Sequence, residues 1–537
     1  MSFFALPADI VVERDVEIQM DDGVTLRANV YRPDGDGEYP VILSGTAYGK
    51  DEFTADYCVD FPALAEMGCY VGSFQVSDHT SFEAPDPAYW VPRGYVVAVY
   101  DTRGYFRSDG RPGLFSPRDI RDYAAVVEWA GTRSWSNGRV ATMGVSQLAI
   151  LQWYLAAQRP AHLTAIVPWE GASDPFADIN VHGGIPETRF NQWWLQVARN
   201  GTTSNSLTLN PLTPHIGKHL PQLARHIVQP AELEQIEVPA LICAAWSRQG
   251  LHSRGAFRGF ERIGSRQKWL YTHGRKEWQV FYEPEALAFQ ERFLEHFLKG
   301  HDNGMDEVPP VRLEIRHSLR QYAVRAESSW PPPDITPTKL YLDADDGTMG
   351  TTRPQSVAAA RYEPDASPGL TFTTTFQHST EITGPTALRL WVQTDDAADM
   401  DLFVVLRKLD ASGEEVYFEG TDGFEQAPVA HGWQRASRRL LKPGTSTSLA
   451  PDLDLAHRLP MEKRHPTAVE IEILPHSTYF RAGEQLVLQI AGHDIGGNPR
   501  MGCDRTINKG PHILHTGGPW NTHLLVPLVS QQRSELS

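Results

Sequence analysis

The chain has 537 residues, several times the roughly 100–200 residues of a typical domain, so two or three domains are expected. Apolar residues make up 41% and charged residues 21% of the chain, which is ordinary globular usage and excludes a disordered or fibrous protein. The net charge is −17, and a chain this acidic is a poor ligand for nucleic acid or for an anionic membrane surface. We therefore expect a small-molecule partner.

The cysteines and the N-terminal sequence bear on the cellular compartment. Cys58, Cys69, Cys243 and Cys503 show no Cys-x-x-Cys spacing, so a disulfide framework is not expected. The N-terminus has neither the basic start nor the apolar core of a secretion signal. The sequence contains no run of about 18 apolar residues, so no membrane span is predicted. We expect a cytoplasmic protein without a membrane partner.

The first 170 residues and the segment after 238 predict an α/β core. Residues 16–20, a turn at 21–23 and residues 24–31 indicate a β-hairpin. Apolar runs are typical of strands buried on both faces of a parallel sheet. Such strands are expected at 40–43, 95–100, 139–143, 164–168, 240–246 and 268–272, and helices at 119–130, 147–159 and 284–299. Alternating strands and helices imply the α/β class.

This alternation stops in the middle of the chain. Helices are expected at 186–201 and around 220–227, without convincing strands. We interpret residues 173–237 as a helical cap inserted between the two parts of the core, 1–172 and 238–326.

The expected cap carries two adjacent tryptophans. Trp193 and Trp194 would line a substrate pocket beneath the cap. Packing of the cap on the core is an equally good explanation of two large aromatic side chains.

The composition changes again beyond residue 300. Residues 327–338 are rich in proline and predict a linker. Short strands are then expected at 340–342, 387–392, 402–406, 469–474, 486–490 and 523–529. We therefore predict that residues 327–537 form an all-β domain, a sandwich or jelly roll.

A Gly-x-Ser sequence lies between a predicted strand and a predicted helix. Gly144 and Ser146 stand where a nucleophile elbow would expose a serine hydroxyl beside the N–H groups of a helix N-terminus. The pattern Gly-x-Ser-x-Gly is incomplete because Leu148 replaces the second glycine. An ordinary helix-capping serine is the alternative.

A nucleophilic serine needs a histidine base, which in this fold order follows the last strands. His182, His252 and His273 all lie in loop-like positions. We choose His273, which directly follows the predicted strand at 268–272, with a structural histidine as the alternative. The sequence contains no Walker loop, dinucleotide motif or zinc spacing, so no cofactor and no metal are expected.

Motifs spread along the chain point to one family. They lie at 86–94, 135–139, 144–146, 168–174, 250–255, 271–274, 400–403 and 480–484. Together they resemble the CocE/NonD hydrolases, the relatives of cocaine esterase, Xaa-Pro dipeptidyl-peptidase and the α-amino acid ester hydrolases. The resemblance covers nearly the whole chain. It implies an α/β-hydrolase core, a helical cap and a C-terminal jelly roll.

The resemblance also implies roles for individual residues. Ser146 matches the nucleophile and His273 the base. Tyr48 matches the tyrosine whose hydroxyl helps to form the oxyanion hole, together with the backbone N–H of Gln147. The family usually has tyrosine at position 147, but a backbone donor does not depend on the side chain.

A further departure affects the catalytic acid. Arg248 stands where the family has the aspartate of the triad, and a guanidinium cannot accept the imidazole N–H. Glu170 follows a neighbouring strand and would reach the same sheet edge, so it is our hypothesis for a replacement acid. The alternative is that Glu170 holds the cap or pairs a charge. Asp174 and Glu277 rank below it. Arg248 itself is expected in the substrate pocket.

These observations predict a serine hydrolase that cleaves an ester or amide through an acyl-enzyme on Ser146. The alternative is a catalytically degenerate hydrolase fold that binds an acyl-like ligand or a partner with little turnover. A third interpretation makes the jelly roll a carbohydrate- or protein-binding module. The sequence does not decide whether the protein forms a homo-oligomer or which acyl and leaving groups its substrate has.

Overall fold

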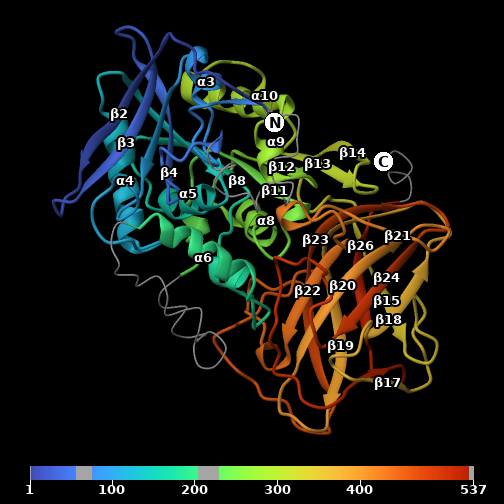
Figure 1. Cartoon of the computed structure of the whole chain (residues 1–537). Coiled ribbons are helices and arrows are strands. Elements are labelled where there is room, and N and C mark those ends of the chain that lie inside the picture. Colours follow the sequence, from blue (N-terminus) through green and yellow to red (C-terminus); the bar gives the residue numbers. More distant parts are fainter. Residues whose placement is uncertain (1, 56–74, 203–228, 531–537) are drawn as a thin grey trace.

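The computed structural model describes residues 2–55, 75–202 and 229–530. These residues form an α/β domain, which contains the N-terminus, and a C-terminal all-β domain beside it (Figure 1). None of the described helices has the length and apolar character needed to span a bilayer. The expected division into an α/β core and a β domain is confirmed.

Among the described residues, a sheet of ten strands forms the centre of the α/β domain. Its order is β2-β3-β6-β4-β7-β8-β11-β12-β13-β14, parallel from β6 to β13 and antiparallel at both ends. The strands are β2 (Ile10–Gln19), β3 (Thr25–Pro33), β4 (Tyr39–Thr46), β6 (Val96–Asp101), β7 (Ser136–Val145), β8 (Leu163–Trp169), β11 (Ala240–Ala245), β12 (Lys268–His273), β13 (Val311–Arg316) and β14 (Tyr322–Glu327).

Both faces of this sheet are apolar and covered. On β4, Val41 and Leu43 belong to one buried cluster, whereas Ile42 belongs to another. Helices α4 (Pro117–Gly131), α5 (Gln147–Ala157) and α8 (Ser253–Arg262) contribute to the first cluster, and α10 (Pro284–Leu294) contributes to the second. The strands therefore lack the polar face of a one-sided sheet, which explains their continuous apolar runs.

The elements expected in the core are present, but helix α8 was not expected, and two other regions also differ. The helix expected at 284–299 is α-helical only to Leu294, and its last turn, Glu295–Lys299, is π-helical. Strands β13 and β14 were not expected. They extend the core to Glu327. The linker is shorter than predicted because β15 (Thr336–Asp343) begins inside the proline-rich segment.

The inserted segment combines a helix with two short strands. Helix α6 (Phe190–Asn200) confirms the helix expected at 186–201. The expectation of no strands is wrong, because β9 (Val181–His182) and β10 (Ile185–Pro186) form a small antiparallel ladder. The helix expected around 220–227 lies outside the described residues.

The C-terminal domain is a two-layer antiparallel sandwich. Strands β15, β26, β19 and β23 form one layer, and β18, β24, β20 and β22 form the other. Their inward side chains share one buried cluster. The finer jelly-roll topology stays a prediction. Besides β15, the strands are β16 (Thr348–Gly350), β17 (Ala358–Tyr362), β18 (Leu370–Thr375), β19 (Thr380–Thr394), β20 (Asp401–Leu409), β21 (Glu415–Val416), β22 (Ala430–Arg435), β23 (Thr467–Phe480), β24 (Gln485–Ala491), β25 (His512–Thr516) and β26 (His523–Leu528).

Candidate active site

Ser146 occupies a strained turn between β7 and α5. Its φ is 56° and its ψ is −114°, a conformation that costs free energy for a residue with a side chain. Gly144 has a φ of +148°, and a Cβ there would lie 2.7 Å from the Cβ of Leu148. The first glycine therefore makes room for the leucine that replaces the second one. The geometry is that of a nucleophile elbow despite the incomplete motif.

His252 is the histidine that contacts Ser146. It lies buried at the N-terminus of α8, and its Nε2 is 2.9 Å from the Oγ of Ser146. The serine hydroxyl donates to Nε2 in the tautomer that carries its proton on Nδ1. Within the described part of the chain, this Nδ1 has no hydrogen-bond partner. Among the residues that the structure describes, Ser146 and His252 thus form a dyad without an acid.

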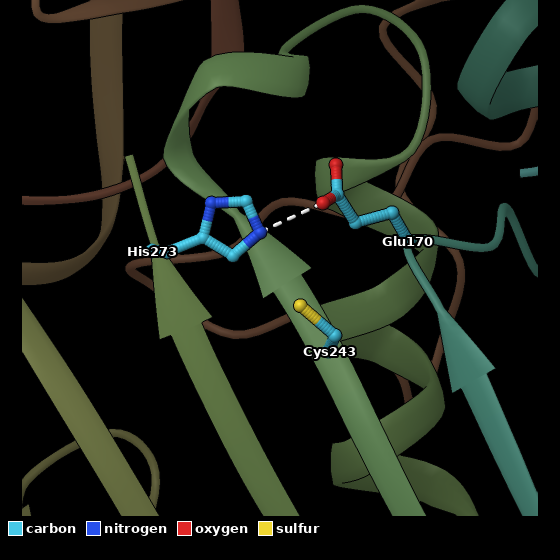
Figure 2. Close-up of side chains that lie close together, drawn as sticks. All are labelled: Glu170, Cys243 and His273. Carbon is cyan, nitrogen blue, oxygen red and sulfur yellow. Dashed lines mark hydrogen bonds and ion pairs between the residues drawn. The ribbon is translucent and has the colours of Figure 1, made fainter. Parts of the chain in front are cut away.

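His273 has different partners. Its Nε2 lies 2.7 Å from the Oε1 of Glu170 (Figure 2). Its Nδ1 accepts a hydrogen bond from the Arg275 N–H at 3.2 Å. Its strand, β12, is separated from β7 by β8 and β11. Both ring nitrogens of His273 are therefore already hydrogen-bonded to other groups. The predicted pairing of His273 with Ser146 is replaced by the pairing of His252 with Ser146.

Glu170 follows β8 directly and is buried, with a φ of 58°. Burial raises the pKa of its carboxyl group to about 8, and the charge of Arg248 opposes this shift. Its expected approach to His273 is observed, but His273 is not the histidine at Ser146. Asp174, the weaker candidate, accepts a hydrogen bond from the N–H of Ala177 at 3.2 Å, in its own turn.

Glu170, His273 and Cys243 bring a carboxylate oxygen, an imidazole nitrogen and a thiol sulfur within 4.8 Å of one another (Figure 2). Carboxylate, imidazole and thiolate are ligand types that suit zinc. However, the Nε2 hydrogen of His273 is directed to Glu170, and the Nε of Arg248 lies 3.7 Å from that carboxylate. A guanidinium this close repels a cation, so the cluster is better described as a buried hydrogen-bonded pair.

Arg248 is buried and joins the two domains. Its Nη1 lies 2.8 Å from the Oδ1 of Asp422 in the β domain, and its guanidinium lies 5.1 Å from the ring centroid of Trp278. Burial and the positive charge of Arg248 hold the pKa of His252 well below its usual value. Arg248 therefore opposes protonation of His252, whereas an aspartate at this position would favour it.

Two candidate oxyanion donors flank the elbow. The backbone N–H of Gln147 belongs to the first residue of α5 and has no acceptor within the helix. The ring of Tyr48 is buried against Phe82, at 5.3 Å between centroids, and its oxygen accepts a hydrogen bond from the Nε1 of Trp194 at 3.0 Å. The Ala47 N–H donates to the Gln147 side chain at 3.3 Å, which ties the Tyr48 loop to the elbow.

The two tryptophans of the insertion take different positions. Trp194 contacts Tyr48, whereas Trp193 packs against Phe190, at 5.7 Å between ring centroids. Trp193 therefore contributes to the packing of the insertion. Trp194 therefore lies beside Tyr48, which the family resemblance assigns to the oxyanion hole.

A cavity lies between the two domains beside Arg248. Its lining includes Ser247 and Gln249, which flank Arg248 in the chain, and Trp433 and His431 of the β domain, whose rings stack with an interplanar angle of 3°.

His252 is the site residue that sequence reasoning did not select. The signal was present, because His252 lies in the motif at 250–255, a few residues after β11 and directly before α8. Strand ends at this edge of a parallel sheet carry functional loops. What the sequence did not show is which of two histidines at that edge turns toward Ser146.

Comparison with known proteins finds matches to both domains. Residues 22–280 match the X-Pro dipeptidyl-peptidase (S15 family), and residues 303–525 match the X-Pro dipeptidyl-peptidase C-terminal non-catalytic domain. The cocaine esterase of Rhodococcus sp. (strain MB1 Bresler) is 25% identical over 629 residues, covering 97% of this chain and 99% of that protein.

Solved structures extend the comparison to the fold. The crystal structure of a CocE/NonD family hydrolase from Staphylococcus aureus is 37% identical, with a TM-score of 0.90 over 97% of this chain and 94% of that one. An α-amino acid ester hydrolase is 18% identical with a TM-score of 0.69, covering 98% of each chain, and supports the fold alone.

Proposed function

Since the chain belongs to the CocE/NonD family of serine hydrolases, we propose that it cleaves an ester or amide by acyl transfer to Ser146, with His252 as the base. The observation that carries this proposal is the 2.9 Å contact between the Ser146 Oγ and the His252 Nε2. A nucleophile and a base within hydrogen-bond reach are the minimum that covalent acyl transfer needs.

The reaction follows from these positions. The Oγ of Ser146 attacks the acyl carbon while its proton passes to the Nε2 of His252. The carbonyl oxygen becomes an oxyanion, which the N–H of Gln147 and the hydroxyl of Tyr48 stabilise. The imidazolium then gives its proton to the leaving alcohol or amine, and water, activated by the same nitrogen, hydrolyses the acyl-enzyme.

The surroundings of His252 make this a slow catalyst. No acid accepts from its Nδ1 among the described residues, and the charge of Arg248 opposes the imidazolium. Removing the charge of a triad aspartate lowers kcat about ten-thousand-fold in a serine protease. The lack of an acid at His252 among the described residues and the charge of Arg248 also support the second candidate, a hydrolase fold that binds an acyl-like ligand with little turnover.

Labelling with a fluorophosphonate tests the dyad without knowledge of the substrate. We expect one adduct per chain, on Ser146, detected by mass spectrometry. His252→Gln should slow labelling at least a hundredfold, because general-base catalysis contributes about 10²–10⁴-fold. His273→Gln should label within a few-fold of the native rate, since His273 contacts Glu170 and not the serine.

The reverse ranking of the two variants would restore His273 as the base. Circular dichroism of both variants shows whether slow labelling comes from unfolding. A folded native protein that takes up no label would favour the binding function over hydrolysis.

A further inference from the structure

We propose that the β domain binds a neutral oligosaccharide on the outer surface of one sheet, on a surface formed by Tyr341, Trp391, His515, Trp520 and His523, which we call the aromatic face. The proposal does not depend on hydrolysis at Ser146. It concerns the half of the molecule that the proposed reaction does not use.

Strand alternation places these side chains outside the sandwich. On β19, Leu388 and Leu390 belong to the buried cluster between the layers, whereas Trp391 is half-buried and outside that cluster. Trp391 pairs in register with His515 of β25, and Tyr341 of β15 pairs with His523 of β26. Four neighbouring strands thus turn aromatic rings to the same side.

The rings form two contacting groups. Trp391 lies 5.0 Å from Trp520, and His515 lies 5.5 Å from Trp520, measured between ring centroids. Tyr341 and His523 are 5.6 Å apart. Aromatic faces carry partial negative charge, and the C–H bonds on one side of a pyranose ring present the complementary positive edge. A sugar chain can therefore bury these rings while its hydroxyl groups stay hydrated.

A hollow lies beside this face and shares His523 with it. Its apolar lining is supplied by Ala387, Leu388 and Leu525, and its polar lining by Lys339, Arg389, Ser448, Glu470, Asn521 and His523. A lining that mixes apolar and polar side chains matches a sugar, which has one face of C–H bonds and a rim of hydroxyl groups.

Two of the three charged side chains that line the hollow compensate each other. The Nη1 of Arg389 lies 2.8 Å from the Oε1 of Glu470, so these two charges compensate each other. The Nε of Arg389 is buried and has no hydrogen-bond partner among the described residues. A sugar hydroxyl would satisfy this donor without adding charge. An anionic ligand would meet Glu470, and a cationic one would meet Lys339 and Arg389.

The test measures binding to the full-length protein by isothermal titration calorimetry, with maltohexaose, cellohexaose and N-acetylchitohexaose as probes. We expect one of these chains to bind, and Trp391→Ala and Trp520→Ala to weaken it at least tenfold. Tyr417→Ala is the matched control, because Tyr417 is an exposed aromatic residue of the same domain outside the aromatic face. Phosphonylation of Ser146 should be unchanged in all three variants.

Absence of binding by all three probes would overturn the proposal, as would equal weakening by Tyr417→Ala. The aromatic face could instead join two copies of the chain. Analytical ultracentrifugation of Trp391→Ala distinguishes this outcome, because a shift from dimer to monomer would assign the face to self-association and overturn the saccharide proposal.

Discussion

Two histidines at the same sheet edge have different chemical surroundings. His252 contacts the serine through Nε2, whereas His273 uses both ring nitrogens within a buried network. Burial lowers the pKa of His273 to about 3, and burial together with Arg248 lowers the pKa of His252. Both rings are therefore neutral at pH 7, but only His252 is placed to take a proton from Ser146.

The depressed pKa of His252 predicts an unusual pH dependence. A base must be unprotonated, so labelling of Ser146 is retained above its pKa and lost as the pH falls through it. An ordinary histidine titrates near 6.5. Because the pKa of His252 lies well below that value, we expect the rate of fluorophosphonate labelling to stay level from pH 8 down to pH 6. A fall in rate centred near pH 6.5, with the fold intact by circular dichroism, would contradict this.

Tyr48 is expected to act on the oxyanion. Its hydroxyl accepts from Trp194, and that bond polarises the phenol and strengthens it as a donor. Tyr48→Phe should lower kcat about a hundredfold or more, the effect of losing one oxyanion donor. Trp194→Phe, which removes only the supporting bond, should lower kcat less. The kinetics need an ester that the protein hydrolyses, such as a p-nitrophenyl ester.

A purely structural tyrosine would behave differently. In that case Tyr48→Phe would change the melting temperature and leave kcat within a few-fold of the native value. The ring packing on Phe82 is retained in the variant, so we expect little change in stability.

At the scale of the elements, the nucleophile elbow depends on the side-chain sizes at positions 144 and 148. Leu148 is fully buried in the cluster on one face of the sheet, and the absent side chain of Gly144 makes room for it. The leucine is therefore part of the core, and the second glycine of the motif is not needed to hold Ser146 in its turn.

Leu148→Ala separates packing from chemistry. Deleting a buried leucine side chain costs about 2–5 kcal/mol of unfolding free energy, because it removes apolar contacts and leaves a cavity. We expect denaturant unfolding to show that loss, while the rate of Ser146 labelling below the transition stays within a few-fold. A labelling rate reduced as strongly as in His252→Gln would mean that the leucine also holds the nucleophile.

At the scale of the whole molecule, buried ion pairs connect the two domains. Arg248 pairs with Asp422, and Arg254 of α8 pairs with Asp452 and Glu472 of the β domain. An arginine at position 248 therefore has a structural role across the interface. Restoring aspartate there would place a third carboxylate near Glu170 and Asp422, so it is not expected simply to restore a triad.

Asp422→Asn tests this connection. The side chain keeps its size, and asparagine tolerates the φ of 59° at this position. Loss of one partner of a buried pair costs about 3–5 kcal/mol. Glu425→Gln is the control, because its pair with Arg320 is exposed and such pairs contribute about 0–1 kcal/mol. Equal melting temperatures for the two variants would show that the interface does not depend on the pair.

The sequence by itself determined the α/β core, the all-β second domain and the serine elbow, whereas Tyr48 and Gln147 were expected as oxyanion donors only from the resemblance to the family. These features depend on local patterns, such as continuous apolar runs and a Gly-x-Ser sequence between a strand and a helix. Glu170 was also placed near His273, because both follow parallel strands whose ends meet at one sheet edge.

The tertiary structure alone decided the histidine at Ser146 and the partners of Arg248. His252 and His273 both reach the same edge, and their ring orientations depend on contacts with residues distant in the chain. Asp422 is 174 residues away from Arg248. Strand β13 was missed because its sequence alternates apolar with charged residues, and the charged ones are buried only through packing beside β12 and, at Arg316, beside β23 of the second domain. Strand β14 is largely exposed and pairs with β13, so it has no buried apolar run that would predict it. Side-chain pairing across such separations is fixed by packing, which no local pattern records.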